Sequence, residues 1–148
     1  MKRRTKQFGL RVIRLVQSLP RAGAADVIGR QLLRAATAVG ANYKSSCRAR
    51  TDKDFLARMG IVEEEADESS SWLELLLEAN LVTPVAVGDL LGEADEIARI
   101  VVASIKTAKS RVAKASSRHP AAVGARKSEI RPAPQGYAVA GNPKSEIG

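Results

Sequence analysis

Five carboxylates fall within six positions of the stretch GIVEEEADESSSWLELL, residues 60–76, which also holds the only tryptophan of the chain. Carboxylate clusters can bind metal ions or transfer protons, and some four-helix bundles hold two metals between Glu-x-x-His pairs on facing helices. The only histidine, His119, lies beyond the last predicted helix, so such pairs cannot form inside a bundle. The five carboxylates are Glu63, Glu64, Glu65, Asp67 and Glu68.

The spacing of this acidic run favours a surface over a reaction centre. At about 100° per residue, the carboxylates spread around the side of a helix that lies away from its apolar stripe, and they converge on no common point. We interpret the run as a solvated or ion-paired face that faces basic helices. The chain also lacks a glycine-rich phosphate loop, a Ser/His/Asp set and a metal-ligand cluster. We therefore expect no catalysis, no cofactor and no bound metal; a metal-binding or small-molecule-binding bundle is the weakest alternative.

Length and composition fit one helical domain. The chain has 148 residues, of which 45% are hydrophobic but only 3% aromatic, so its core must consist mainly of Leu, Val, Ile and Ala. No stretch reaches the roughly 18 apolar residues of a membrane span, and no signal peptide is visible. A single cysteine, Cys47, excludes an internal disulfide. We expect a cytoplasmic protein without a membrane partner, in which Cys47 is a small core residue rather than a reactive thiol.

Four amphipathic segments would position these side chains. Pro20 stops the first segment, Thr51 can cap the third, and Asn80 with Pro84 separates the third from the fourth. The segments cover roughly residues 5–19, 25–48, 51–80 and 86–114. Their inward stripes are Phe8, Val12, Leu15 and Leu19; Ile28, Leu32, Ala35, Val39 and Tyr43; Phe55, Met59, Val62, Ala66, Ser69, Leu73 and Leu76; and Leu90, Ala94, Ile97, Val101, Ile105, Ala108 and Val112.

These segments predict an all-α fold. Four similar helices with short connections favour an antiparallel up-and-down four-helix bundle over residues 1–115. Over residues 116–148 the apolar period stops and prolines and glycines accumulate, which predicts a disordered basic tail.

Two of the predicted helices carry apolar residues away from the core stripe. A single bundle would leave such residues exposed to solvent, and exposed apolar strips usually mark interfaces. We therefore expect self-association, with Trp72 as an anchor residue of the interface. The alternative is a broad apolar face that wraps further around the helix. Gln31 and Asn42, at the edge of the second helix's apolar face, would fix helix register or subunit contacts. The expected interface residues are Trp72, Ile61, Leu75, Leu10, Ile13, Gln31 and Asn42.

The net charge of +8 is unevenly distributed. Residues 1–50 carry 12 Lys or Arg against Asp26 alone, whereas residues 51–100 carry 3 against 13 Asp or Glu. The polar face of the second helix is almost purely basic, which predicts phosphate contacts without sequence preference. The alternative is that this basic face pairs with the acidic third helix of a neighbouring subunit. The expected nucleic-acid-binding residues are Arg30, Arg34, Lys44 and Arg48, with Arg4, Arg11 and Arg14.

The stretch over residues 31–76 resembles the four helix bundle protein family, first met as reading frames inside intervening sequences of bacterial large-subunit ribosomal RNA genes. The matching signals are Gln31, GANY at 40–43, DF at 54–55 and the run EEEADES followed by WLELL; with SLPR at 18–21, the similarity extends over residues 8–112. This sequence departs from the family pattern at Ala38, at Ser71 and in its long tail.

The resemblance implies an antiparallel four-helix bundle that assembles as a ring-like homopentamer without known enzymatic activity. A related branch, the accessory variability determinant protein of diversity-generating retroelements, is a basic pentamer that binds nucleic acid and a reverse transcriptase. The leading hypothesis is therefore a non-enzymatic oligomeric scaffold that binds RNA or DNA and serves a reverse transcriptase. The alternative is a protein-interaction module that binds no nucleic acid.

Overall fold

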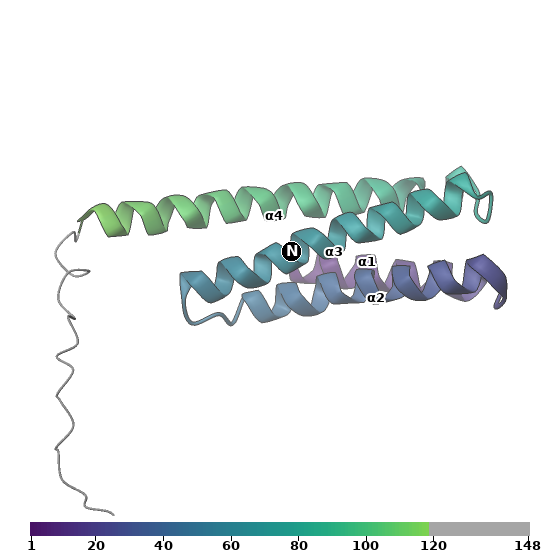
Figure 1. Ribbon diagram of the computed structural model, residues 1–148, viewed down its shortest axis with the longest axis horizontal. Coiled ribbons are helices and arrows are strands. Elements are labelled where there is room, and N and C mark those ends of the chain that lie inside the picture. Colours follow the sequence, from purple (N-terminus) through teal and green to yellow (C-terminus); the bar gives the residue numbers. More distant parts are fainter. Residues whose placement is uncertain (119–148) are drawn as a thin grey trace, which may run out of the picture. The chain divides into compact units, whose positions relative to one another are not determined.

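The computed structural model describes residues 1–118 of the chain, and this part is helical (Figure 1). No strand occurs in residues 1–118. Our prediction of an all-α fold is confirmed. The disordered tail predicted over residues 116–148 falls mostly on residues 119–148, which lie outside the described part. The helices are α1 (Lys2–Ser18), α2 (Gly23–Ser46), α3 (Asp52–Glu78) and α4 (Pro84–Arg118).

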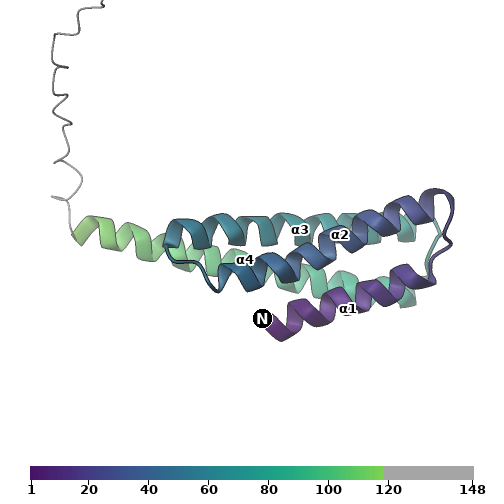
Figure 2. The ribbon, with the colours of Figure 1, turned by 90° about the horizontal axis from the view of Figure 1, so that it is seen from below.

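The four helices pack side by side as a bundle (Figures 1 and 2). Each helix contacts the next one in the chain, and α1 also contacts α4, which closes the bundle. The connections are short and lie at alternating ends of the bundle, as Figure 1 shows. This arrangement is consistent with the predicted up-and-down order. None of the helices in residues 1–118 is both long enough and apolar enough to span a membrane.

Local capping fixes the ends of α3 and the start of α4. Thr51 precedes α3, and its Oγ1 accepts a hydrogen bond of 3.1 Å from the backbone N–H of Asp54. At the other end, Asn80 adopts a left-handed backbone with φ of 55°, and the N–H of Leu81 donates to the carbonyl of Leu76, the pattern that closes many helices. Pro84 then occupies the first position of α4, where its missing N–H costs nothing.

The helices α1 and α4 are longer than their apolar periods indicate. Helix α1 begins at Lys2 instead of residue 5, and α4 runs from Pro84 to Arg118 instead of from 86 to 114. The added residues are mostly charged or small, so they sustain helical backbone without adding to the apolar stripe. Residues 116–118, which we assigned to the tail, are therefore part of α4.

The predicted inward stripes form the core. Phe8, Leu32 and Leu73 are fully buried, and most of the other predicted core residues are buried with them. Ser69, in the α3 stripe, is buried as well. Its hydroxyl is satisfied there because it donates a hydrogen bond of 2.7 Å to the carbonyl of Glu65. Three predicted core residues are less buried than expected: Tyr43 and Phe55 are half-buried, and Val112 is 36% exposed.

The prediction for Cys47 was wrong. Its thiol-bearing side chain is exposed, because α2 ends at Ser46 and Cys47 already belongs to the turn that follows. The apolar period from which we inferred a buried cysteine does not continue beyond the end of the helix.

Candidate functional site

The acidic run of α3 binds a basic residue of the same chain. The guanidinium of Arg34, on α2, contacts Glu68 at 2.5 Å and Glu65 at 3.5 Å. The hydrogen bond from Arg34 lowers the pKa of Glu68, and the bond from the indole of Trp72 acts in the same direction. Our alternative hypothesis paired the basic face with the acidic helix of a neighbouring subunit, but for Arg34 these partners lie within its own chain.

Trp72 is part of this contact rather than a free surface anchor. Its indole Nε1 donates 3.1 Å to Oε1 of Glu68, the same oxygen that Arg34 contacts. The ring is half-buried and packs against the bundle core. Trp72 therefore links the acidic run to the core, and only part of its surface is available to a partner.

Most of the predicted basic residues pair with carboxylates of the same chain. Arg4 contacts Glu93 at 2.5 Å and Glu96 at 3.9 Å, both on α4. The hydrogen bond that Arg4 donates to Glu93 raises the pKa of the Arg4 guanidinium. The remaining pairs of this kind are Arg11 with Asp89, at 3.6 Å, and Arg30 with Asp26, at 2.5 Å. These pairs are largely exposed, so solvent and salt weaken them, but they reduce the positive field of the predicted face.

Three predicted basic residues keep their charge unpaired. None of the ion pairs within residues 1–118 involves Arg14, Lys44 or Arg48. All three side chains are exposed. Lys44 and Arg48 also share a groove of about 610 Å³ between α1 and α2.

The groove brings together residues that the sequence analysis placed in separate groups. Its rim carries four cations and no carboxylate, and its walls include Leu10 and Ile13, which we had assigned to an oligomer interface. The small residues of the two helices allow close approach: a Cβ at Gly40 would lie only 3.6 Å from the carbonyl oxygen of Thr5. The lining residues are Lys2, Thr5, Lys6, Gly9, Leu10, Ile13, Ala36, Thr37, Gly40, Ala41, Lys44 and Arg48.

Lys2 and Lys6 were not among the predicted site residues, although their spacing in the sequence indicates a common face with two residues that were. Together with Leu10 and Ile13 they recur at helical spacing, which places all four on one side of α1. Both lysines precede Phe8, the first residue of the predicted apolar stripe, and so they were not assigned to a face.

The other expected interface residues differ in exposure. Ile61 and Leu75, on α3, are 40% and 43% exposed, which leaves apolar surface for a partner. Gln31 is exposed and accepts a weak hydrogen bond from Nε of Arg34, 3.4 Å long. Asn42 is half-buried, and its amide donates to the carbonyl of Ala38 on the previous turn, so it is satisfied within α2.

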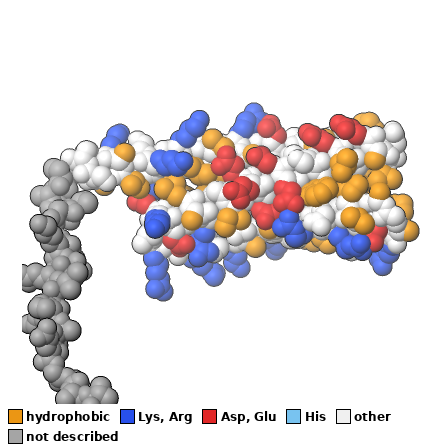
Figure 3. All heavy atoms as spheres, in the orientation of Figure 1, with side chains coloured by type: hydrophobic (Ala, Val, Ile, Leu, Met, Phe, Trp, Pro, Cys, Tyr) orange, Lys and Arg blue, Asp and Glu red, His pale blue; other side chains and the backbone are white. Residues whose placement is uncertain are grey.

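The surface view shows where the two signs of charge gather on one face. On the face drawn in Figure 3, many acidic side chains lie in the middle and hydrophobic ones toward one end, while Lys and Arg follow the lower edge, where α2 lies, and part of the upper edge, where α4 lies. The acidic side chains in the middle of this face therefore border a basic edge along α2.

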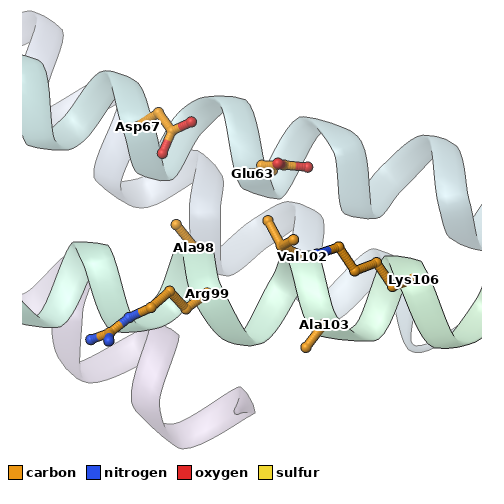
Figure 4. Close-up of a pocket in the computed structure, with 7 residues that line it drawn as sticks. All are labelled: Glu63, Asp67, Ala98, Arg99, Val102, Ala103 and Lys106. Carbon is orange, nitrogen blue, oxygen red and sulfur yellow. The ribbon is translucent and has the colours of Figure 1, made fainter.

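A shallow pocket of about 370 Å³ between α3 and α4 holds part of the acidic run (Figure 4). Glu63 and Asp67 line it from α3, and Arg99 and Lys106 line it from α4. The side chain of Arg99 extends away from the two carboxylates in Figure 4 and contacts Asp95 and Glu96 instead. Within residues 1–118, no group of three or more His, Cys, Asp or Glu side chains is arranged to hold a metal ion.

Comparison with known proteins identifies the family of the chain. The family model described as the 23S rRNA-intervening sequence protein matches residues 1–103. The chain belongs to this family. No protein with curated annotation matches it.

A solved structure from the same group of proteins has a similar fold. It is a crystal structure, at 1.70 Å resolution, of a protein of unknown function from the S23 ribosomal protein family of Bacteroides thetaiotaomicron. The two sequences are 26% identical, the match covers 71% of this chain and 97% of the other, and the TM-score is 0.66. The family match and the bundle agree, and residues 104–118 of α4 extend beyond the family match.

Proposed function

We propose that this 23S rRNA-intervening sequence family protein is a non-enzymatic, homo-oligomeric helical scaffold that binds nucleic acid through the basic rim of the α1–α2 groove. The observation that carries the proposal is the set of four cations, Lys2, Lys6, Lys44 and Arg48, which have no carboxylate partner within residues 1–118. Unpaired cations on one face attract a polyanion and release its counterions.

Oligomerisation strengthens such a surface. The exposed apolar side chains of Ile61 and Leu75 are available for self-association, and the resemblance to the four helix bundle proteins favours a pentamer. A ring repeats the basic rim in every subunit, so several weak phosphate contacts combine into useful avidity. The contacts read charge rather than bases, so binding is independent of sequence.

The proposal includes a cytoplasmic location and a protein partner. The resemblance to the accessory variability determinant branch favours a reverse transcriptase, to which the scaffold would present its bound RNA or DNA. Co-purification with a retroelement reverse transcriptase, before and after nuclease treatment, tests this part of the proposal by itself.

The decisive test is a pair of matched charge-neutralising variants. Lys44→Gln with Arg48→Gln removes two unpaired cations, and Arg30→Gln with Arg99→Gln removes two exposed cations that already have carboxylate partners. Retention of short RNA and DNA duplexes is measured by fluorescence anisotropy across a salt series. We expect the first variant to lower the slope of log affinity against log salt by about 1.8, at about 0.9 per phosphate contact, and the second to change it little. Equal behaviour of the two variants would refute the basic rim as the site.

A second function, a protein-interaction module without nucleic-acid binding, is favoured by one specific observation. Arg4, Arg11, Arg30 and Arg34 all contact carboxylates of their own chain, so much of the predicted basic face is neutralised. This alternative predicts that neither duplex is retained by the oligomer and that the Lys44→Gln, Arg48→Gln variant changes the mass of the assembly.

A further inference from the structure

The C-terminal part of α4 leaves the bundle. In Figures 1 and 2, α4 continues beyond the turn that joins α2 to α3. Its buried residues end at Ala108, and every side chain from Lys109 to Ser117 is exposed. The family match ends at residue 103, so this segment lies outside the part of the chain shared with the family. An exposed helix of this length gains little from packing and is suited to meet a partner.

The projecting segment is basic. Residues 106–117 contain four Lys or Arg and no Asp or Glu. Within residues 1–118, the ion pair that reaches the segment joins Arg111 to Asp52 at 3.7 Å, and both side chains are more than half exposed. Such a pair contributes little to stability, so Arg111 can exchange Asp52 for another anion at low cost.

The cations cover the whole outer side of the segment. At about 100° per residue, Lys106, Lys109, Arg111 and Lys114 spread over an arc of about 200°. The remaining arc continues the core stripe, but with only small residues and Val112. Because Val112 is the one apolar residue larger than alanine in residues 106–117, this arc gives no apolar face for a membrane surface and no large anchor for a protein partner.

We infer that residues 106–117 of α4 form a site for duplex DNA, in which the helix enters the major groove and its cations meet phosphates on both walls. This inference rests on the proposed function and adds a second, chain-specific site to it. The segment spans about 18 Å at about 1.5 Å per residue, and a helix with side chains is about 10–12 Å wide, close to the roughly 12 Å width of the major groove. The residues between the cations are mostly Ala, Ser and Thr, which allow close approach.

The same features select among nucleic acids. The segment has no aromatic residue on which unpaired bases could stack, which disfavours single strands. The major groove of A-form RNA is too narrow and deep for side chains to read, which disfavours duplex RNA. Duplex DNA is the polyanion whose groove matches a helix that carries cations on two sides.

Charge reversal in the full-length chain tests the inference. Lys109→Glu with Lys114→Glu alters two exposed side chains outside the core, so circular dichroism should show an unchanged melting temperature. Binding to a mixed-sequence duplex DNA of about 20 base pairs should weaken at least about tenfold at 0.1 M salt, with a salt slope lower by about two. The matched control, Lys109→Arg with Lys114→Arg, keeps the charge and should bind as the unmodified protein does.

The outcomes separate this inference from the proposed function. Loss of DNA binding at unchanged oligomer mass supports the site on α4. Unchanged binding would overturn it, as would an equal loss on duplex RNA or a fall in oligomer mass, which would make the segment a subunit contact. If only the Lys44→Gln, Arg48→Gln variant loses affinity, the α4 site fails and the proposed function stands. If the unmodified protein retains no nucleic acid, both fail.

Discussion

At the residue scale, the carboxylate of Glu68 joins the ion pair with Arg34 to the half-buried Trp72. Glu68 accepts hydrogen bonds from Arg34 on α2 and from Trp72 on its own helix. The contact lies at the edge of the bundle, where neither partner is fully desolvated, so its contribution to stability is modest but depends on pH. The chain has one tryptophan, so the state of this single contact can be followed by fluorescence.

We predict that Glu68→Gln removes part of the dependence of stability on pH in acid. The contacts with Arg34 and Trp72 hold the pKa of Glu68 below its ordinary value of 4.5. A lowered pKa contributes stability above that ordinary value, and the contribution is lost as pH falls through the folded-state value. The free energies of unfolding of the two proteins should therefore differ most near neutral pH and converge as the pH falls below the folded-state pKa of Glu68. Urea titrations followed by Trp72 emission measure the free energy of unfolding of each protein at each pH. A difference that grows in acid would contradict the assigned contact.

The sequence predicted the buried side of each helix well because burial follows the helical period. Phe8, Leu32 and Leu73 were assigned inward from spacing alone, and each is fully buried. Side-chain partners across the bundle do not follow from spacing, because they depend on how neighbouring helices rotate against each other. For that reason Arg34 was predicted to bind phosphates or, in the alternative, a neighbouring subunit, and the groove that joins Lys6 to Lys44 was not foreseen.

At the element scale, α3 has a defined start. We predict that Thr51→Ala lowers the free energy of unfolding by about 1 kcal/mol, because the N–H of Asp54 loses the acceptor that caps the helix. Chemical denaturation measures the loss. Thr51→Ser keeps a hydroxyl acceptor and should retain most of the stability, so an equal loss in the serine variant would point to a role of the methyl group instead.

The buried side of α3 gives a second prediction at this scale. Leu73→Ala should cost about 2–5 kcal/mol, because Leu73 is fully buried and its truncation leaves a cavity. Leu75, two residues along the same helix, is 43% exposed and serves as the matched control. Leu75→Ala in the dissociated protein should cost less than about 1 kcal/mol. Similar losses for the two variants would mean that Leu75 is covered within the folded subunit.

At the scale of the whole molecule, the exposed apolar residues of α3 bear on assembly. We predict that Ile61→Glu with Leu75→Glu shifts the protein toward smaller species, because each places a charge at an exposed apolar position that a partner would cover. Trp72 is a less suitable probe, since it also packs against the core of its own subunit. Mass photometry measures the shift.

The control for this experiment adds the same charge elsewhere. Val85, at the start of α4, is 93% exposed, and Val85→Glu should leave the mass distribution unchanged. An unmodified protein that sediments only as a monomer near 15.8 kDa would contradict the oligomeric scaffold itself.

The order of contacts in the bundle also has a kinetic consequence. Each helix packs mainly against its neighbour along the chain, and the contact between α1 and α4 is smaller than each of these three interfaces. Folds dominated by such local contacts have short loops to close and cross their barriers in about microseconds to milliseconds. The subunit should therefore fold quickly, with closure of α1 onto α4 the step that brings together the most distant parts of the chain, and any slower phase in refolding would belong to the meeting of subunits.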